Sequence, residues 1–256
     1  MKVSIITPSF NQDKYIGQCV ESVLTQSYRN LEHIIIDNLS TDGTCKVLSN
    51  YSHDKRLKVI SERDRGQGDA VNKGVRFSTG DIIIWLNSDD FLSSVEVVEQ
   101  IVAIFQIDDK LDAVYGGVTF FEQGSNLTRY VPPLPMMYDM FRYIAFIGNS
   151  NIFLKRYILE NNKVSLNLHF VIDHEWLLRV FKGQMRYKRI PLSITNFRRH
   201  EDAKTSVYDQ SFKAEEGVVR DQTSGKRSYC DSMFSLLYRC IFFTLTLNGR
   251  FRKKWK

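Results

Sequence analysis

The sequence has few cysteines, and none of them lies in a pattern typical of structural cysteines. The four are Cys19, Cys45, Cys230 and Cys240. No two form a C-x-x-C pair, and none combines with histidine at the spacing of a zinc site. A chain of 256 residues can bury a core without disulfide bonds or a structural metal ion. The cysteine usage therefore favours a reducing, cytoplasmic setting. The first residues, M-K-V-S-I-I-T-P, lack the long apolar segment of a secretion signal and predict a strand instead.

Two common nucleotide-binding motifs are also missing. No G-x-G-x-x-G follows a predicted strand, and no G-x-x-x-x-G-K-[ST] occurs. Gly66, Gly68 and Gly74 have the wrong spacing for either motif. These absences argue against a dinucleotide-dependent oxidoreductase and against a P-loop enzyme.

The sequence has no net positive charge outside the last 31 residues. The formal net charge is +6, but residues 226–256 hold eight basic residues and one acidic residue, so the other 225 residues carry about −1. Binding to nucleic acid needs a basic surface that neutralises phosphates. We therefore expect no nucleic-acid partner.

No apolar run is long enough to span a membrane. The longest, 233–247, is interrupted by Arg239 and falls short of the roughly 20 apolar residues that a bilayer requires. A basic and aromatic segment, R-F-R-K-K-W-K, follows it soon after. Two interpretations stay open: peripheral adsorption to an anionic membrane, at the cytoplasmic face of the inner membrane, or a packed terminal helix with a solvated basic end.

The first half of the chain alternates between apolar strands and amphipathic helices. Strands are predicted over 2–8, 31–37, 57–61, 82–86 and 112–115, and helices over 15–26, 44–50, 67–78 and 94–106. This order predicts an α/β fold with a mostly parallel central sheet flanked by helices. Ligands of such folds bind beyond the carboxyl ends of the strands. The segments 8–11, 37–44, 62–69 and 87–90 are therefore the candidate binding loops.

The second half is less regular. It predicts strands over 117–122, 127–131, 185–190 and 193–198, and a helix that begins at Asp173. Met136, Met137 and the aromatic residues of 138–146 predict either an acceptor groove or core packing.

Three of the four candidate loops are rich in carboxylates. Asn87-Ser88-Asp89-Asp90 comes directly after 82–86, and adjacent carboxylates at a strand end repel each other unless a cation lies between them. Hard ions such as Mg²⁺ and Mn²⁺ prefer these oxygens. Asp89, with Asp90 second, is thus a candidate metal ligand. Capping of the helix that follows is the alternative. Asp37, at the end of 31–37, is either a ligand for a base or ribose or a loop residue.

Five segments occur in an order that resembles a known family. They are T-P-S-F-N at 7–11, V-E-S-V-L-T-Q-S-Y at 20–28, I-I-I-D-N-L-S-T-D-G-T at 34–44, S-E-R-D-R-G-Q-G-D-A-V-N-K-G at 61–74 and G-D-I-I-I-W-L-N-S-D-D at 80–90. Together they resemble the inverting family 2 glycosyltransferases, which have the nucleotide-diphospho-sugar transferase (GT-A) fold. The resemblance is dense over the first 120 residues and looser over 169–206.

The resemblance implies a role for each matching position in the first half. Asn87 stands where the family has the first aspartate of D-x-D, which leaves fewer charged ligands for a metal. The implied donor-binding residues are Pro8 and Asn11 in the first loop, Asp37 for the base, Asp64 and Asn72 for the nucleoside, and Asp89 with Asp90 for a Mn²⁺ or Mg²⁺ ion.

The segment F-V-I-D-H-E-W-L-L-R at 170–179 resembles the part of the family that carries the general base. Asp173 is the candidate base and Glu175 its reserve, and capping of the helix is the alternative for Asp173. His200 is expected to reach the metal or the diphosphate, with Arg198, Arg199 and Lys204 near the phosphates.

These inferences together predict a metal-dependent inverting glycosyltransferase. It would move a sugar from a nucleotide-diphosphate donor, a UDP-sugar first of all, to a hydroxyl of a glycan or lipid-linked acceptor in polysaccharide biosynthesis. Residues 1–225 would form the GT-A domain, with a nucleotide-sugar half at 1–120 and an acceptor half at 121–225, and residues 226–256 a tail. The alternatives are a nucleotidyltransferase or phosphohydrolase, which could use the same acidic strand ends, and a catalytically silent binder of sugar nucleotides.

Overall fold

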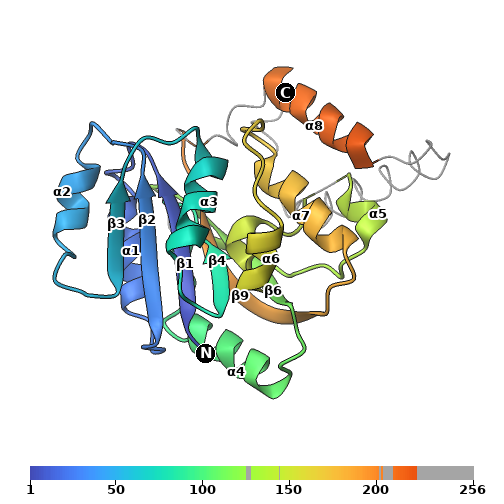
Figure 1. The fold of residues 1–256 in the computed structure, drawn as a ribbon, viewed down its shortest axis with the longest axis horizontal. Helices are drawn as coiled ribbons and strands as arrows, with labels where there is room; N and C mark the ends of the chain where they lie inside the picture. Colours follow the sequence, from blue (N-terminus) through green and yellow to red (C-terminus); the bar gives the residue numbers. More distant parts are fainter. Residues whose placement is uncertain (125–127, 144, 202, 204–209, 224–256) are drawn as a thin grey trace.

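The structure, a computed structural model, describes residues 1–124, 128–143, 145–201, 203 and 210–223. The predicted tail at 226–256 and Lys204 lie outside the described residues. Among the described residues, nine strands form one sheet with helices on both faces (Figure 1). No described helix combines the length and the apolar character needed to cross a bilayer.

The first half of the chain forms the parallel part of the sheet. Its strands are β1 (Val3–Ser9), β2 (Leu31–Asp37), β3 (Leu57–Ser61) and β4 (Ile82–Trp85), in the spatial order β3-β2-β1-β4. The connecting helices are α1 (Ile16–Leu24), α2 (Thr44–Ser49) and α3 (Gln67–Phe77). The register pairs Ser9 with Asp37 and Asp37 with Ser61, so β1, β2 and β3 end at one level. The sequence predicted all four strands to within a residue or so.

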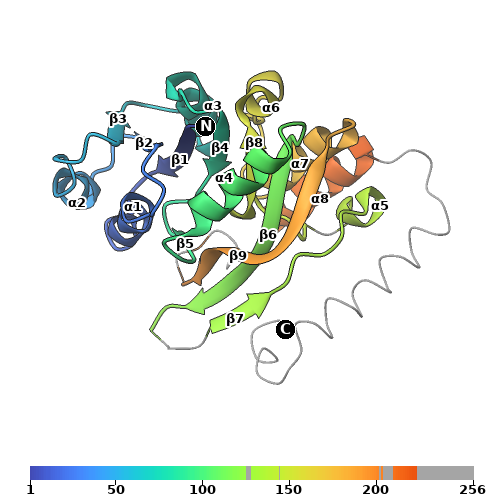
Figure 2. The ribbon, with the colours of Figure 1, turned by 90° about the horizontal axis from the view of Figure 1, so that it is seen from below.

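Alternating side chains of the parallel strands build the core on the two faces of the sheet. Ile5 and Ile84 face α1 and α4 (Val97–Ile107), and Ile6 and Trp85 face α3 and α7 (Ile172–Lys182). These side chains are fully or almost fully buried. Figure 2 shows α1 and α3 on opposite sides of the strands. This two-sided burial explains why the strands are continuous apolar runs.

The second half of the chain extends the same sheet. The order continues from β4 through β8 (Ile152–Lys155), β6 (Ala113–Glu122) and β9 (Tyr187–Arg199) to β5 (Phe91–Leu92), and β7 (Thr128–Val131) pairs with β6. Pairs with β8, β7 and β5 are antiparallel, whereas β6 and β9 are parallel. The remaining elements are α5 (Tyr138–Phe141), the 3₁₀ turn η1 (Asn149–Asn151), α6 (Arg156–Asn161) and α8 (Gln210–Thr223).

Two pairs of predicted strands are each one long strand. The predicted strands 112–115 and 117–122 are both in β6, and 185–190 and 193–198 are both in β9. The register between β6 and β9 shifts where Tyr115 pairs with Arg189 and Gly117 with Ser193. This irregularity accommodates Pro191, which has no N–H for the ladder. The predicted boundary of the two halves, at residue 120, falls inside β6.

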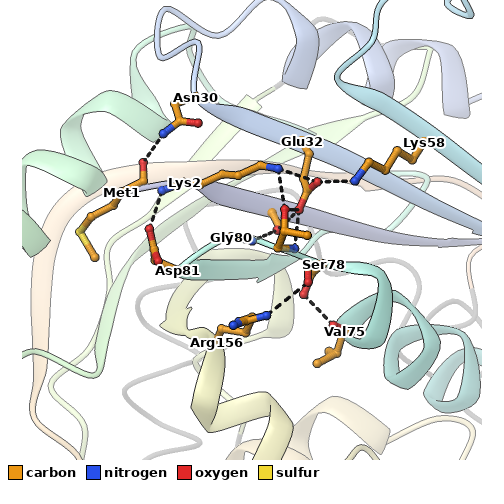
Figure 3. Close-up of polar contacts among 12 residues, drawn as sticks. Met1, Lys2, Asn30, Glu32, Lys58, Val75, Ser78, Gly80, Asp81 and Arg156 are labelled. Atoms are coloured by element: carbon orange, nitrogen blue, oxygen red, sulfur yellow. Dashed lines mark hydrogen bonds and ion pairs between the residues drawn. The ribbon is translucent and has the colours of Figure 1, made fainter.

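A buried carboxylate ties the amino ends of the parallel strands together. Glu32 of β2 lies between the ammonium groups of Lys2 and Lys58, at 2.9 and 2.7 Å, and accepts hydrogen bonds from Ser4 and Thr79 (Figure 3). Burial alone would raise the pKa of Glu32, but the hydrogen bonds from Lys58, Ser4 and Lys2 outweigh it and hold the pKa well below its ordinary value. This network fixes the strands at the edge opposite their carboxyl ends.

Candidate active site

A cleft of about 340 Å³ lies at the carboxyl ends of β1 and β4. Its walls come from the loops after these strands, the start of α3, the turn η1, the start of α7 and the residues after β9. The fold therefore brings together segments up to about 190 residues apart in the sequence. Five of the predicted site residues line it: Pro8, Asp64, Asp89, Asp173 and His200.

Asp89 and His200 meet on one side of the cleft. The Nε2 of His200 lies 3.2 Å from the Oδ2 of Asp89, and the two side chains are 4% and 27% exposed, respectively. The Tyr15 ring packs on the imidazole with the ring centroids 4.3 Å apart. This places His200, which follows β9, beside the strand-end carboxylate, and its expected contact with a metal ion or diphosphate stays a prediction.

The donor set of this pair fits a Mn²⁺ or Mg²⁺ ion bound together with a diphosphate. In the part of the chain that the structure describes, no three His, Cys, Asp or Glu side chains form a complete metal site. Such ions are commonly held by one or two protein groups, with substrate phosphates and water as the other ligands. One carboxylate and one imidazole supply two donors of suitable chemistry.

Asp90 does not line the cleft. It is 1% exposed and accepts hydrogen bonds from Ser150 Oγ at 2.9 Å, from the Arg198 backbone N–H at 3.1 Å and from Asn87 Nδ2 at 3.3 Å. Burial, with the nearby charge of Asp89, raises the pKa of Asp90 well above its ordinary value. As a second metal ligand, Asp90 would have to leave these partners. Neither carboxylate caps the next helix, because α4 begins at Val97 and its cap is Glu96.

Arg198 lies behind the two aspartates and not in the cleft. Its Nε donates to the Asp89 carbonyl at 2.9 Å, and its guanidinium packs among the rings of Tyr15, Phe91 and Phe121. The side chain is 3% exposed, and burial lowers the pKa of the guanidinium. Its charge offsets the carboxylates from the inside of the protein, so the predicted contact with phosphate is not available to it in this arrangement.

Asp173 also lines the cleft, from the first turn of α7. The helix begins at Ile172 and its cap residue is Val171, which makes no side-chain capping hydrogen bond, so the alternative in which Asp173 caps the helix is wrong. Burial raises the pKa of Asp173, and the backbone N–H groups of His174 and Asn149 oppose this shift. Glu175, the reserve base, is away from the cleft and pairs with Arg179.

The start of α7 is held from outside by α8. The Glu215 carboxylate accepts hydrogen bonds from the backbone N–H groups of His169, Phe170 and Val171, at 2.8 to 3.2 Å. The rings of Phe170 and Phe212 also pack together. His169 and Phe170 line the cleft, so α8 helps to set the wall beside Asp173.

The predicted nucleoside residues divide into two groups. Asp64 lines the cleft, and burial raises its pKa. Asp37 is fully buried and accepts hydrogen bonds from Ser40 and Ser61, which order the loop after β2.

Asn11 and Asn72 also hold backbone and do not line the cleft. The Oδ1 of Asn11 accepts from the Thr41 N–H at 2.9 Å. The side chain of Asn72 bonds both the N–H and the C=O of Val164.

Sequence reasoning did not single out several polar residues of the cleft, and Asn149 is one of them. It lies in an irregular segment between apolar runs, and the sequence carries no periodicity or motif there that could have singled it out.

The chain belongs to glycosyl transferase family 2, because the model of that family matches residues 4–182. The match includes Asp64, Asp89 and Asp173 but ends before His200 and Glu215. The predicted family is thus confirmed.

The curated relatives include two bacterial proteins of different length. The chain is 42% identical over 114 residues to chondroitin synthase of Escherichia coli, which is 44% of this chain and 16% of that protein. It is 29% identical over 175 residues to an uncharacterized glycosyltransferase of Haemophilus influenzae, 68% of each. The chain thus spans only a small part of the first relative.

Solved structures share the fold across almost the whole chain. The structure of S. aureus TarS 1-349 in complex with UDP-GlcNAc matches with a TM-score of 0.66 and 16% identity, over 100% of this chain and 78% of that one. The mannosyltransferase PcManGT from Pyrobaculum calidifontis, in complex with GDP-Man and Mn2+, matches with a TM-score of 0.62 and 17% identity, over 96% and 70%. The GT-A fold predicted from the sequence is confirmed.

Proposed function

We propose that this protein is a metal-dependent inverting glycosyltransferase that moves a sugar from a nucleotide diphosphate to a hydroxyl group. The observation that carries the proposal is that one cleft is lined both by Asp89 with His200 and by the buried carboxylate of Asp173. Such a transfer needs a site for the leaving diphosphate and a base for the attacking hydroxyl, with the sugar between them.

Asp173 is the proposed base. In a single displacement, the acceptor hydroxyl attacks the anomeric carbon and gives its proton to a carboxylate as the bond to the diphosphate breaks. Burial raises the pKa of Asp173, which brings it closer to the pH at which the enzyme works and so strengthens it as a base.

Asp89 and His200 would hold the metal ion, and Pro8 and Asp64, which line the same cleft, would contact the nucleoside. A bound Mn²⁺ or Mg²⁺ ion neutralises diphosphate charge and stabilises the leaving group. We favour UDP-sugars as donors, since the related TarS structure contains UDP-GlcNAc, but the PcManGT complex with GDP-Man keeps GDP-sugars in the test.

The acceptor and the setting belong to the same proposal. A glycan or lipid-linked acceptor, polysaccharide biosynthesis and work in the cytoplasm, at the inner face of the inner membrane, follow from the family resemblance and the basic tail. The domain from 1 to 225 and the membrane-contacting tail at 226–256 stay predictions.

Two substitutions test the proposed roles separately. Asp173→Asn should lower turnover by at least about 100-fold, the usual contribution of a general base, with nucleotide binding unchanged. Asp89→Asn should remove the part of nucleotide binding that depends on Mn²⁺. Asp139→Asn is the control, because its side chain is 87% exposed. The readout is nucleoside diphosphate release from UDP- and GDP-sugars with hydroxyl acceptors.

Three outcomes would contradict the proposal. Wild-type turnover in Asp173→Asn would show that Asp173 is not the general base. Release of phosphate or pyrophosphate without a sugar acceptor would favour a phosphohydrolase or nucleotidyltransferase. Donor binding without turnover on any acceptor would favour a catalytically silent protein.

A further inference from the structure

Asn149 is a cleft residue whose side chain is held rigidly. It opens the turn η1, is 6% exposed and lines the same cleft as Asp89 and Asp173. Its Nδ2 donates to the Trp85 carbonyl at 3.1 Å and to the Asn87 Oδ1 at 3.0 Å. The two hydrogens of the amide are thus both engaged by atoms at the end of β4.

These partners fix which end of the amide points away from β4. The Trp85 carbonyl can only accept a hydrogen bond, so the nitrogen must face it. The Oδ1 of Asn149 then lies on the other side of the amide. No residue described by the structure donates to this oxygen, and it is not sealed from solvent. The cleft wall therefore carries one fixed, available hydrogen-bond acceptor.

The neighbours of Asn149 indicate which part of a bound substrate would contact its Oδ1. Its backbone N–H is directed at the Asp173 carboxylate, and its side chain bonds Asn87, which precedes Asp89 by two residues. Asn149 thus bridges the base and the metal-binding pair. In a displacement at an anomeric carbon, the group between the base and the diphosphate is the sugar that is transferred.

We infer that Asn149 is a specificity-determining residue that accepts a hydrogen bond from a hydroxyl of the donor sugar through its Oδ1. The inference rests on the proposed function and adds to it a residue that recognises the donor sugar. A site that hydrogen-bonds a hydroxyl discriminates against a sugar that lacks it, because the acceptor oxygen is then left without a partner in a cleft closed by ligand.

The test compares a sugar nucleotide with its free nucleotide. Calorimetric titration in Mn²⁺ uses UDP-glucose and UDP, or GDP-mannose and GDP, whichever pair binds the wild-type protein. Asn149→Ala should weaken binding of the sugar nucleotide by about three- to tenfold, the range of one neutral hydrogen bond, with the free nucleotide unchanged. Deoxy forms of the same donor probe the wild-type protein without any substitution. One deoxy donor should bind the wild type as weakly as the parent binds Asn149→Ala, and should lose nothing more in the variant.

Asn151→Ala is the matched control. Asn151 belongs to the same turn and is equally buried, but its side chain bonds Gly116 and Gly148 and does not line the cleft. Equal loss of sugar nucleotide and free nucleotide in Asn149→Ala, or the same loss in Asn151→Ala, would show a structural effect and overturn the inference. So would unchanged donor affinity with a raised KM for the acceptor. If neither pair binds the wild type, the proposed UDP- or GDP-sugar donors fail together with the inference, whereas normal binding of both members of the pair to Asn149→Ala overturns the inference alone.

Discussion

The Glu32 network gives a prediction about stability that is separate from the chemistry of the cleft. Glu32→Gln replaces one carboxylate oxygen by an NH₂ group that faces the ammonium groups of Lys2 and Lys58. Breaking a buried ion pair from one side costs about 3–5 kcal/mol, but the two lysine side chains here are 34% and 44% exposed, which lowers the figure. We expect a loss of about 2–3 kcal/mol in the free energy of unfolding.

Urea and thermal unfolding at neutral pH measure this loss. For a chain of this size, each kcal/mol lowers the Tm by about 2–4 °C, so Glu32→Gln should unfold roughly 4–12 °C below the wild type. The control is Glu160→Gln, which removes an ion pair of 3.6 Å between half-exposed side chains. An exposed pair of this kind contributes about 0–1 kcal/mol.

The pH dependence of the difference follows from the lowered pKa of Glu32. A carboxyl group with a lowered pKa in the folded state contributes stability above its pKa in the unfolded chain, about 4.3, and loses it as the pH falls towards the folded value. The gap between wild type and Glu32→Gln should therefore be full at pH 6–7 and narrow below about pH 4. A loss of stability no larger than that of Glu160→Gln would show that the Glu32 network does not stabilise the fold as expected. A difference between wild type and Glu32→Gln that widens in acid would contradict the lowered pKa of Glu32.

Three further predictions concern the walls of the cleft. Gly68→Ala should cost about 1–3 kcal/mol or more, because its Cβ would lie 2.2 Å from the Ser165 carbonyl oxygen, and thermal unfolding measures this. Glu215→Ala should speed hydrogen exchange of the amides at 169–171 about tenfold or more, because it removes their charge-assisted partner. Since the base must be deprotonated and burial raises the pKa of Asp173, kcat/KM should fall with decreasing pH on a limb that lies above about 3.9, the ordinary aspartate value.

Each of these predictions has a control or a contradictory result. Gly217→Ala, a helix position with open space around its Cβ, should be neutral or stabilising, and an equal loss in both glycine variants would contradict the clash. Unchanged hydrogen exchange at 169–171 in Glu215→Ala would show that Glu215 does not hold these amides. A pH profile that is flat down to pH 4 would show that no raised carboxyl group limits the reaction.

The parallel strands could be predicted because their burial on both faces is written into the chain as apolar runs. The apolar run Ile82–Trp85 predicts a buried strand, and the end of this strand fixes the place of Asp89. The antiparallel β8 could not be predicted because its pairing partners are distant in the sequence. The helices α5 and α6 have four and six residues, too few to show a helical period. The merging of 185–190 and 193–198 depends on a bulge opposite Tyr115 and Gly117, which only the register shows.

The site was predictable as to position but not as to orientation. The end of a strand places both Asp37 and Asp89 at the ligand-binding edge, yet Asp37 turns inward to Ser40 and Ser61 while Asp89 lines the cleft. Asn87 appeared as a missing carboxylate. In the structure its amide connects Asp90 with Asn149, a contact between the two halves that no local pattern encodes.

The proposed function depends on Asp89 and His200 binding a metal ion together with a nucleoside diphosphate. Its most direct test is the thermal unfolding of the wild-type protein and Asp89→Asn with UDP, GDP, dTDP and CDP, each with and without Mn²⁺. A ligand at 100 times its Kd adds about 2.7 kcal/mol, or roughly 5–10 °C in Tm. We predict such a rise for the wild type with one nucleotide in Mn²⁺, and its loss in Asp89→Asn. No rise in Tm with any nucleotide, or the same rise in Asp89→Asn, would contradict metal-dependent nucleotide binding at Asp89 and His200.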